Sequence, residues 1–249
     1  MKRFDFVSVF KKEFNASFKL LTIVLGGMVT PLFIYGFFSM VVGGNSFDSY
    51  MPYKHYMVSG TVIFQLVYST FYQASYSTFF SSNVTQTMDE LLTSPLNSKD
   101  ILLGRTLSTS MITVIVSIPL LICLIFWSGL LFNLVWYLIA LVGLAVLAII
   151  FSLLGTLLGI LVNSEFSLIN FANMIVIPLT FVSDTFVKLS AIPSLKYILY
   201  CSPIKLANDV VREALVLSKL NWLSGLILVL FMVVSWVVVY KVFDKKLKD

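Results

Sequence analysis

Charged residues are scarce in this chain of 249 residues. Asp, Glu, Lys and Arg make up 12% of it, hydrophobic residues make up 59%, and the mean hydropathy is +0.96. A soluble globular domain carries about 25% charged residues. Long apolar runs with so few charges predict helices that span a bilayer. Because the runs lack polar alternation, barrel strands are a poor alternative. We therefore expect an all-α integral membrane protein.

The residue types that serve catalysis and metal binding are also rare. His55 is the only histidine, and Cys123 and Cys201 form no motif, so neither a zinc site nor a disulfide framework is predicted. No glycine precedes a lysine, which excludes a phosphate-binding loop, and no H-E-x-x-H, C-x-x-C or G-x-S-x-G motif occurs. Carboxylates are few and none is clearly placed at mid-membrane, which argues against an ion-driven pump. An energised transporter with this sequence must obtain its energy from a partner.

Six apolar segments are long enough to cross a bilayer, since a span needs about 20 residues. They are expected at residues 20–42, 56–80, 107–127, 134–162, 168–187 and 222–242. The basic, amphipathic residues 1–19 precede them and are expected to form a helix on the membrane surface. In the fourth segment, Gly155 and Gly159 form a small-xxx-small pattern, which lets two helices approach closely.

Basic residues set the expected orientation of these spans. Of the 17 Lys and Arg residues, eleven fall on the face that carries both termini and six fall on the other. The positive-inside rule therefore places both termini in the cytoplasm of a cell (inner or plasma) membrane. The net charge of +5 would suggest nucleic acid on a soluble protein. Here the basic residues flank the spans and indicate contact with anionic membrane lipid instead.

The second segment carries an aromatic stripe mixed with polar side chains, and the fifth carries two asparagines on one face. Polar groups within a span usually face the protein interior or a cavity, so both sets could line a translocation path. The candidates are Phe64, Tyr68, Phe71, Tyr72, Asn170 and Asn173. Ordinary aromatic packing and interhelical hydrogen bonds of the asparagines remain alternatives.

A short polar stretch, residues 86–100, separates the second and third segments. Thr87 can cap a helix that has acidic residues in its first turn, Pro95 can end that helix, and Ser98 can cap the next one. A short charged helix between two spans suits contact with a cytoplasmic partner, and a solvated loop is the alternative. The residues expected to make this contact are Asp89, Glu90, Leu91, Leu92, Pro95, Lys99 and Asp100.

A second irregular stretch, residues 188–215, separates the fifth and sixth segments. Pro193 and Pro203 divide it into two short helical pieces, because proline removes a backbone donor and clashes with the preceding turn. The piece between the prolines is about half the length of a span. It is therefore expected to be part of an outer re-entrant hairpin, and a soluble surface loop is the alternative. The expected gate residues are Asp184, Pro193, Leu195, Ile198, Pro203 and Arg212.

These two stretches resemble the type-2 ABC exporter permeases. In their outer hairpin, members read roughly F-x-S-G-x-F-F-P-L, then a Pro, then N-P-L-T-Y, then a late Arg. The matching residues here are Phe181, Ser183, Phe186, Leu189, Pro193, Pro203 and Arg212. Asp184 stands at the usual Gly, Ser202 stands at the usual Asn, and Lys205 lies in the Thr-Tyr region. These departures bear on the substrate more than on the fold.

The coupling stretch resembles the same family, whose members commonly read E-E-L-L-x-x-P-L-x-x-x-x-x-x-G-K there. The counterparts are Asp89, Glu90, Leu91, Leu92, Pro95, Leu96, Gly104 and Arg105. The resemblance covers essentially the whole chain and implies one exporter transmembrane domain over residues 1–249.

What the resemblance implies is a transport subunit rather than an enzyme. It would pair with a second permease copy, as a homodimer, and dock two separate ATP-binding subunits. No cofactor is expected in this chain, because ATP and Mg²⁺ would bind the partner subunits. ATP would close the nucleotide-binding pair, push the coupling helix, and open a path outward for a drug, a lipid or a lipid-linked glycan.

Three other kinds of membrane protein are alternatives to this interpretation. An integral membrane enzyme would need a clustered His, Asp or Glu site near the interface, and a passive channel would need a filter signature. Neither pattern is found in the sequence. A membrane scaffold is the third alternative, and co-purification with an ATPase would separate an exporter from all three.

Overall fold

The computed structural model describes residues 10–11, 14, 21–42, 51–84, 98–189 and 199–246. Within these ranges it contains seven α-helices and two π-helical turns. The α-helices are α2 (Leu21–Val42), α3 (Tyr53–Phe79), α5 (Ser98–Ser128), α6 (Leu134–Leu161), α7 (Glu165–Phe181), α9 (Pro203–Arg212) and α10 (Trp222–Lys246). The π-helical turns are η1 (Phe80–Val84) and η3 (Glu213–Leu217). The all-helical fold class is thus confirmed.

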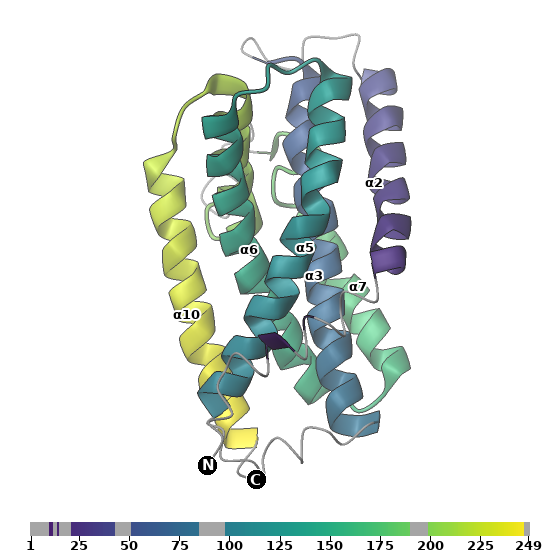
Figure 1. The fold of residues 1–249 in the computed structure, drawn as a ribbon, viewed down its shortest axis with the longest axis vertical. Helices are drawn as coiled ribbons and strands as arrows, with labels where there is room; N and C mark the ends of the chain where they lie inside the picture. The colour runs from purple at the N-terminus through teal and green to yellow at the C-terminus, as the bar shows by residue number, and fades with distance from the viewer. Residues whose placement is uncertain are drawn as a thin grey trace.

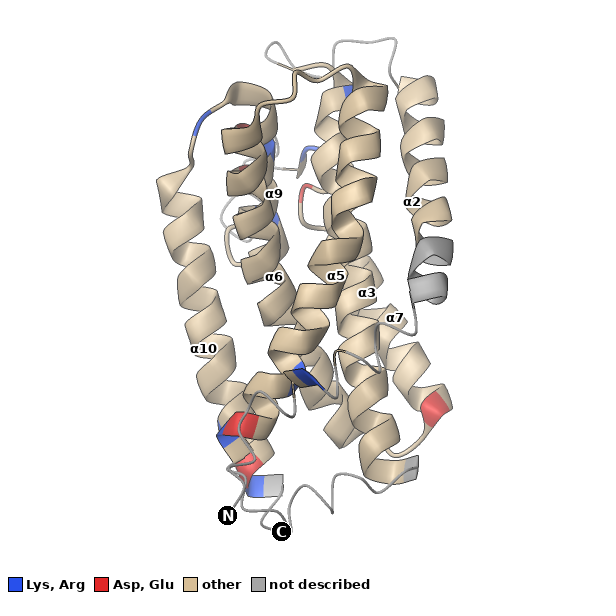
Figure 2. Cartoon of the chain, viewed as in Figure 1, with Lys and Arg blue, Asp and Glu red and all other residues tan. Residues whose placement is uncertain are grey.

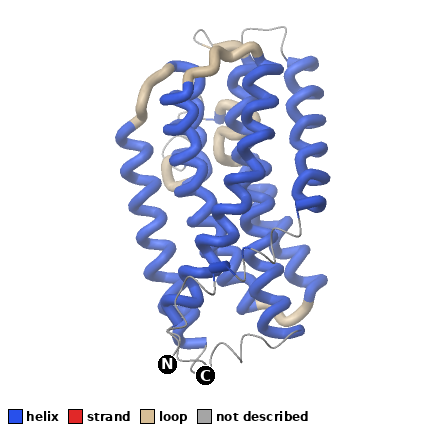
Figure 3. The backbone as a smooth tube through the Cα atoms, in the orientation of Figure 1, coloured by secondary structure: helices blue, strands red, loops and turns tan. Residues whose placement is uncertain are grey.

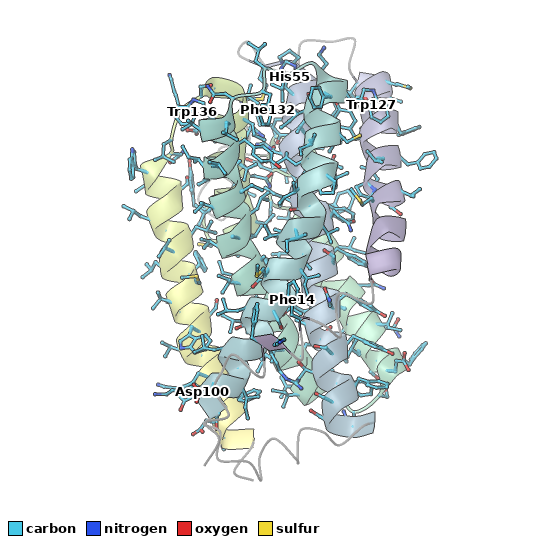
Figure 4. All side chains as sticks on the ribbon, in the orientation of Figure 1. Phe14, His55, Asp100, Trp127, Phe132 and Trp136 are labelled. Carbon is cyan, nitrogen blue, oxygen red and sulfur yellow. The ribbon has the colours of Figure 1, made fainter. Side chains whose placement is uncertain are left out.

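The long helices run side by side as an elongated bundle (Figure 1). At the lower end of that view α3 and α6 end, α5 and α7 begin, and α10 ends. At the upper end α2 and α5 end, while α3, α6 and α10 begin. Figure 4 places Trp127, Phe132 and Trp136 at the upper end and Asp100 at the lower end. Aromatic residues at the end of an apolar bundle are typical anchors at a membrane interface.

Three described helices are long and apolar enough to cross a membrane: Ser98–Ser128, Leu134–Leu161 and Trp222–Lys245. Met28–Val42, which is part of α2, and Glu165–Phe181, which is α7, are shorter apolar helical stretches. The central helix α3 is long but too polar to be counted with them, and most of its residues are buried. It contacts α2, α5, α6, α7 and α9. A helix covered by protein rather than lipid can carry polar side chains, which accounts for its composition.

The most extensive contact between two described helices is that of α3 with α6. A Cβ atom added at Gly155 would lie 2.5 Å from the Phe71 carbonyl oxygen, and one added at Gly159 would overlap the Ser75 carbonyl oxygen. Only a residue without a side chain fits between two backbones at that separation. The close approach predicted from the small-xxx-small pattern is therefore confirmed.

The predicted bounds of the third and fifth segments differ from those of the helices. Helix α5 begins at Ser98, where the start of a helix was predicted, and it continues without a break into the third segment, which was expected to begin only at residue 107. The last three residues of the predicted coupling stretch therefore form the first turn of α5. Helix α7 begins at Glu165, inside the predicted turn, because the Ser164 side chain accepts a hydrogen bond from the Ser167 backbone N–H at 3.2 Å. It ends at Phe181 rather than 187.

Several predicted site residues lie outside the described ranges. They are Asp89, Glu90, Leu91, Leu92, Pro95, Pro193, Leu195 and Ile198. Of the expected surface helix, Phe10, Lys11 and Phe14 are described as helical. The rings of Phe10 and Phe14 stack with centroids 5.7 Å apart, whereas Lys11 is exposed. This difference agrees with two faces of unlike polarity.

Candidate functional site

The loop after α7, described here over residues 182–189, enters the bundle instead of lying at its surface. The chain turns at residues 182–184, and Asp184 has a φ of 55°, a conformation that Gly, Asn and Asp adopt most readily. This requirement explains why a glycine can stand at the same place in the family pattern. The adjacent Thr185 carbonyl oxygen lies so close to Gly60 that a Cβ there would overlap it.

The position of Gly60 on α3 shows how far the loop extends into the bundle. Gly60 is seven residues beyond Tyr53, the first residue of α3, and at 1.5 Å per residue this is roughly 10 Å along the helix. Figure 3 shows the loop, in tan, at the level of the helices rather than beyond their ends. Helix α7 occupies the lower half of the bundle and α9 the upper half (Figures 1 and 2). Helix α7, the loop and α9 together carry the chain from the lower to the upper end of the bundle, with a break in the helix between them.

Helix α9 turns a polar face toward this loop. Lys205, Asn208, Asp209 and Arg212 recur at steps of three and four, so they share one side of the helix. The amide nitrogen of Asn208 donates to the Thr185 hydroxyl at 3.1 Å and to the Ser183 carbonyl at 3.3 Å. Asn208 is fully buried. These bonds satisfy loop groups that would otherwise be buried without partners.

Arg212 joins α9 both to the loop and to α3. Its Nη2 donates to the Asp184 carbonyl oxygen at 3.0 Å, and its Nε donates to the Ser59 hydroxyl at 3.1 Å. Its guanidinium carbon lies 3.6 Å from the centroid of the Tyr56 ring. A planar guanidinium can stack on an aromatic ring and donate several hydrogen bonds at once, which a lysine cannot.

Lys205 balances the buried acidic groups. Its ammonium nitrogen lies 2.5 Å from an Asp209 carboxylate oxygen and 3.7 Å from an Asp184 carboxylate oxygen. One cation is therefore shared by two carboxylates, and Arg212, the second cation nearby, is held by hydrogen bonds and by the Tyr56 ring. Buried charges need partners of this kind. We call the set the buried polar cluster. It consists of Tyr56, Ser59, Asp184, Lys205, Asn208, Asp209 and Arg212.

Below this cluster, α3 and the first residue of η1 carry a continuous row of aromatic rings. Successive members lie four residues apart, their centroids are separated by 5.9–6.4 Å, and their planes are within 22° of parallel. The row, called here the aromatic ladder, consists of Phe64, Tyr68, Tyr72, Tyr76 and Phe80. All five side chains are partly or fully exposed. Sixteen residues separate its ends, so it extends over roughly 24 Å of helix.

The loop closes the upper end of this ladder. The Phe186 ring lies 5.5 Å from the ring of Phe64 and 5.1 Å from that of Phe181, centroid to centroid. On the α7 side, the Tyr68 hydroxyl donates to the Asn173 side-chain oxygen at 3.2 Å. The interhelical hydrogen bond weighed as an alternative for Asn173 is thus confirmed, whereas Asn170 is exposed.

Phe71 does not belong to the ladder, although it was predicted to lie on the same path. It is buried, and its ring packs edge-on against Phe151 of α6 with centroids 6.3 Å apart. Tyr76 and Phe80 continue the ladder in its place. Steps of four residues from Phe64 lead to Tyr68 and Tyr72 but not to Phe71. Because positions four apart in a helix share a face, this spacing already separates Phe71 from the ladder.

The helices around the ladder are almost free of charge. Between Tyr56 and Val84 the sequence contains no Asp, Glu, Lys or Arg, α2 contains none, and α7 contains only Glu165 at its start. In Figure 2 the ribbon segments coloured as charged residues lie near the two ends, around the loop and on α5 a short way above its start. Lys99 and Asp100, predicted to contact a partner, lie in the first turn of α5 at the charged lower end.

Sequence reasoning missed most of the buried polar cluster. It named Asp184 and Arg212 but not Tyr56, Ser59, Lys205, Asn208 or Asp209 as site residues. The three- and four-residue spacing in α9 was a usable signal, whereas nothing local marks Tyr56 and Ser59. Among the described residues, no group of three or more His, Cys, Asp or Glu side chains could hold a metal ion.

Comparison with known proteins agrees with the resemblance found in the sequence. Residues 4–216 match the family described as ABC-2 type transporter. No protein in the curated collection matches the chain.

Proposed function

The chain belongs to the ABC-2 type transporter family, as its transmembrane permease component, and we propose that it exports a hydrophobic or amphipathic cargo along the aromatic ladder. ABC-2 permeases pair with ATP-binding subunits, and the ATPase is usually a separate chain. The observation that carries the proposal is a partly exposed, charge-free ladder of about 24 Å that is closed at one end by Phe186.

In this proposal α2, α3, α5, α6 and α10 each cross the membrane, and α7, the loop and α9 together make the remaining crossing. Backbone at membrane depth that is not helical persists only where protein buries it or water reaches it. The hydrogen bonds from Asn208 and Arg212 to the loop meet that requirement. The lower end of the bundle faces the cytoplasm, and both termini lie on that side.

The buried polar cluster and Phe186 act as the outer gate. The cluster holds the loop against α3 and α9, and Phe186 covers the top of the ladder. Cargo can leave only when the loop and Phe186 move away from Phe64. Pro203 supports the gate because, as the first residue of α9, it fixes where that helix starts.

The chemistry of the ladder indicates the cargo class. A charge-free wall of rings accepts acyl chains, apolar drugs or the apolar part of a lipid-linked glycan.

The complex proposed is a homodimer of this chain with two ATP-binding subunits that hold ATP and Mg²⁺. Residues 86–100 are its coupling segment, with Asp89, Glu90, Leu91, Leu92, Pro95, Lys99 and Asp100 at the contact. Lys99 and Asp100 lie at the charged lower end, where a cytoplasmic partner would dock.

The test is ATP-dependent transport in proteoliposomes that contain the permease and its ATP-binding subunit. A fluorescent phospholipid and an apolar dye are the probes. Tyr68→Ala and Tyr72→Ala should lower transport of the preferred probe about tenfold, because each removes a ring from the continuous wall. Tyr72→Phe should keep most of it, since the ring remains.

Phe33→Ala serves as the matched control, because Phe33 of α2 is an aromatic residue with 74% of its surface exposed outside the ladder. Wild-type transport in the Tyr68 and Tyr72 alanine variants would refute the path. Failure of the wild-type complex to move either probe with ATP would refute the cargo class.

A further inference from the structure

Helix α10 lies beyond the part of the chain that matches the family, since that match ends at residue 216 and α10 begins at Trp222. Its most apolar stretch is only 17% buried. Most of α10 therefore contacts the bundle through only a small part of the surface of the helix. Its lower end is different, because there it is fastened to the first turn of α5 (Figure 1).

Two polar contacts between described residues contribute to this connection. The Ser98 hydroxyl donates to the Asp244 carboxylate at 3.0 Å. The Lys99 ammonium nitrogen lies 5.3 Å from the centroid of the Tyr240 ring, within the range of a cation–π interaction. Tyr240 and Asp244 are four residues apart and share a face of α10.

An apolar core backs these contacts and is separate from the main core of the bundle. It contains Ile101 and Leu102 of α5, Leu153 of α6, and Val239 and Phe243 of α10, all fully buried. Ile101 and Leu102 follow Ser98 at three and four residues, so one face of the first turn of α5 carries both kinds of contact. A packed core transmits displacement because it is nearly incompressible.

From these contacts we infer that the lower end of α10 is part of the coupling apparatus and that Asp244 is its positioning residue. The inference rests on the proposed function, in which residues 86–100 receive the push of the ATP-binding subunit. Ser98 is where that segment becomes α5. A push on the segment reaches Asp244 through Ser98 and moves α10 together with α5. Asp244 holds the segment in place without touching cargo or nucleotide.

The experiment measures cargo moved per ATP hydrolysed by the complete complex in proteoliposomes. Ser98→Ala and Asp244→Ala should each lower that ratio about tenfold, the order expected for one lost hydrogen bond to a charged group. The double variant should be no worse than either single variant, because both remove the same contact. Ser98→Thr keeps the hydroxyl and should restore the wild-type ratio.

Lys245→Ala is the matched control, since Lys245 is an exposed charged residue in the same turn as Asp244. Thermal unfolding of each variant separates coupling from folding, and the midpoints should stay near wild type. Three outcomes would overturn this inference but leave the proposed function standing. They are wild-type ratios in Ser98→Ala and Asp244→Ala, additive losses in the double variant, and losses that simply follow the unfolding midpoint. A wild-type complex that transports nothing with ATP would overturn the proposed function as well.

Discussion

Arg212 and Tyr56 donate hydrogen bonds to the same acceptor, the backbone carbonyl oxygen of Asp184. The distances are 3.0 Å from Arg212 Nη2 and 2.7 Å from the Tyr56 hydroxyl, and the guanidinium lies over the Tyr56 ring. One carbonyl group therefore joins α3, α9 and the loop between α7 and α9. A hydrogen bond from a charged donor in a buried site is stronger than a neutral one, so Arg212 holds the loop more firmly than a neutral donor in its place would.

Arg212→Lys should destabilise the permease although the charge is retained. Lysine cannot stack on Tyr56 and donate to both Asp184 and Ser59, and the expected loss is about 2 kcal/mol. Thermal unfolding in detergent should show a lower midpoint than wild type. Lys219→Ala, at an exposed position, should leave the midpoint unchanged, and equal effects of both substitutions would contradict the prediction.

Gly60→Ala should displace the re-entrant loop. The new Cβ would overlap the Thr185 carbonyl oxygen, and backbone cannot give way as the tip of a side chain can. Both the unfolding midpoint and ATP-dependent transport should fall. Gly225→Ala in α10 is the control, because nothing lies within 4 Å of a Cβ there. If Gly60→Ala transports normally, the loop does not rest on α3 as described.

Gly155→Ala should weaken the packing of α3 against α6. Its Cβ would lie 2.5 Å from the Phe71 carbonyl oxygen and 3.0 Å from the Ala74 Cβ, so the helices must separate, at a cost of about 2 kcal/mol. Gly143→Ala in the same helix meets a Val210 methyl group at 3.1 Å, and a side chain can shift. Unfolding should therefore begin at a lower temperature for Gly155→Ala than for Gly143→Ala. The reverse order would contradict the close packing of α3 against α6 at Gly155.

Both termini should be reached by reagents from the cytoplasmic side only. Lys2→Cys and Lys248→Cys, each in a chain with Cys123→Ser and Cys201→Ser, test this by labelling with a membrane-impermeant maleimide. The two native cysteines are replaced because both are exposed. Labelling should require permeabilised cells, and labelling of both positions in intact cells would overturn the orientation.

The sequence alone was enough for the fold class, the family and the approximate helices. Hydropathy and charge are local properties, and α2, α6 and the start of α10 lie within one residue of where these properties placed them. The close helix approach predicted from the small-xxx-small pattern at Gly155 and Gly159 was also correct. A residue without a side chain leaves room for another backbone whichever helix packs against it. Boundaries failed where capping outweighed hydropathy, as at Ser164 and Glu165.

Within the candidate site, the sequence identified groups but not their neighbours. The aromatic stripe of α3 was recognised, yet Phe71 was counted with Phe64, Tyr68 and Tyr72, because composition does not say which face of a helix meets α6. Asp184 and Arg212 were expected at the outer gate from the family pattern. Their joining through the Asp184 carbonyl oxygen could not be predicted, since Tyr56 and Arg212 are 156 positions apart in the sequence.

Hydropathy and charge bias by themselves determined that this chain is a helical membrane protein, because most of its long helices carry their own apolar signal, and the resemblance to exporter permeases indicated the family. Only the tertiary structure decided which rings form the ladder, how far the loop enters the bundle, and that α5 is fastened to α10 through Ser98 and Asp244. The physical reason is that buried polar groups must find partners wherever the fold offers them. In this protein those partners come from helices that are distant along the chain.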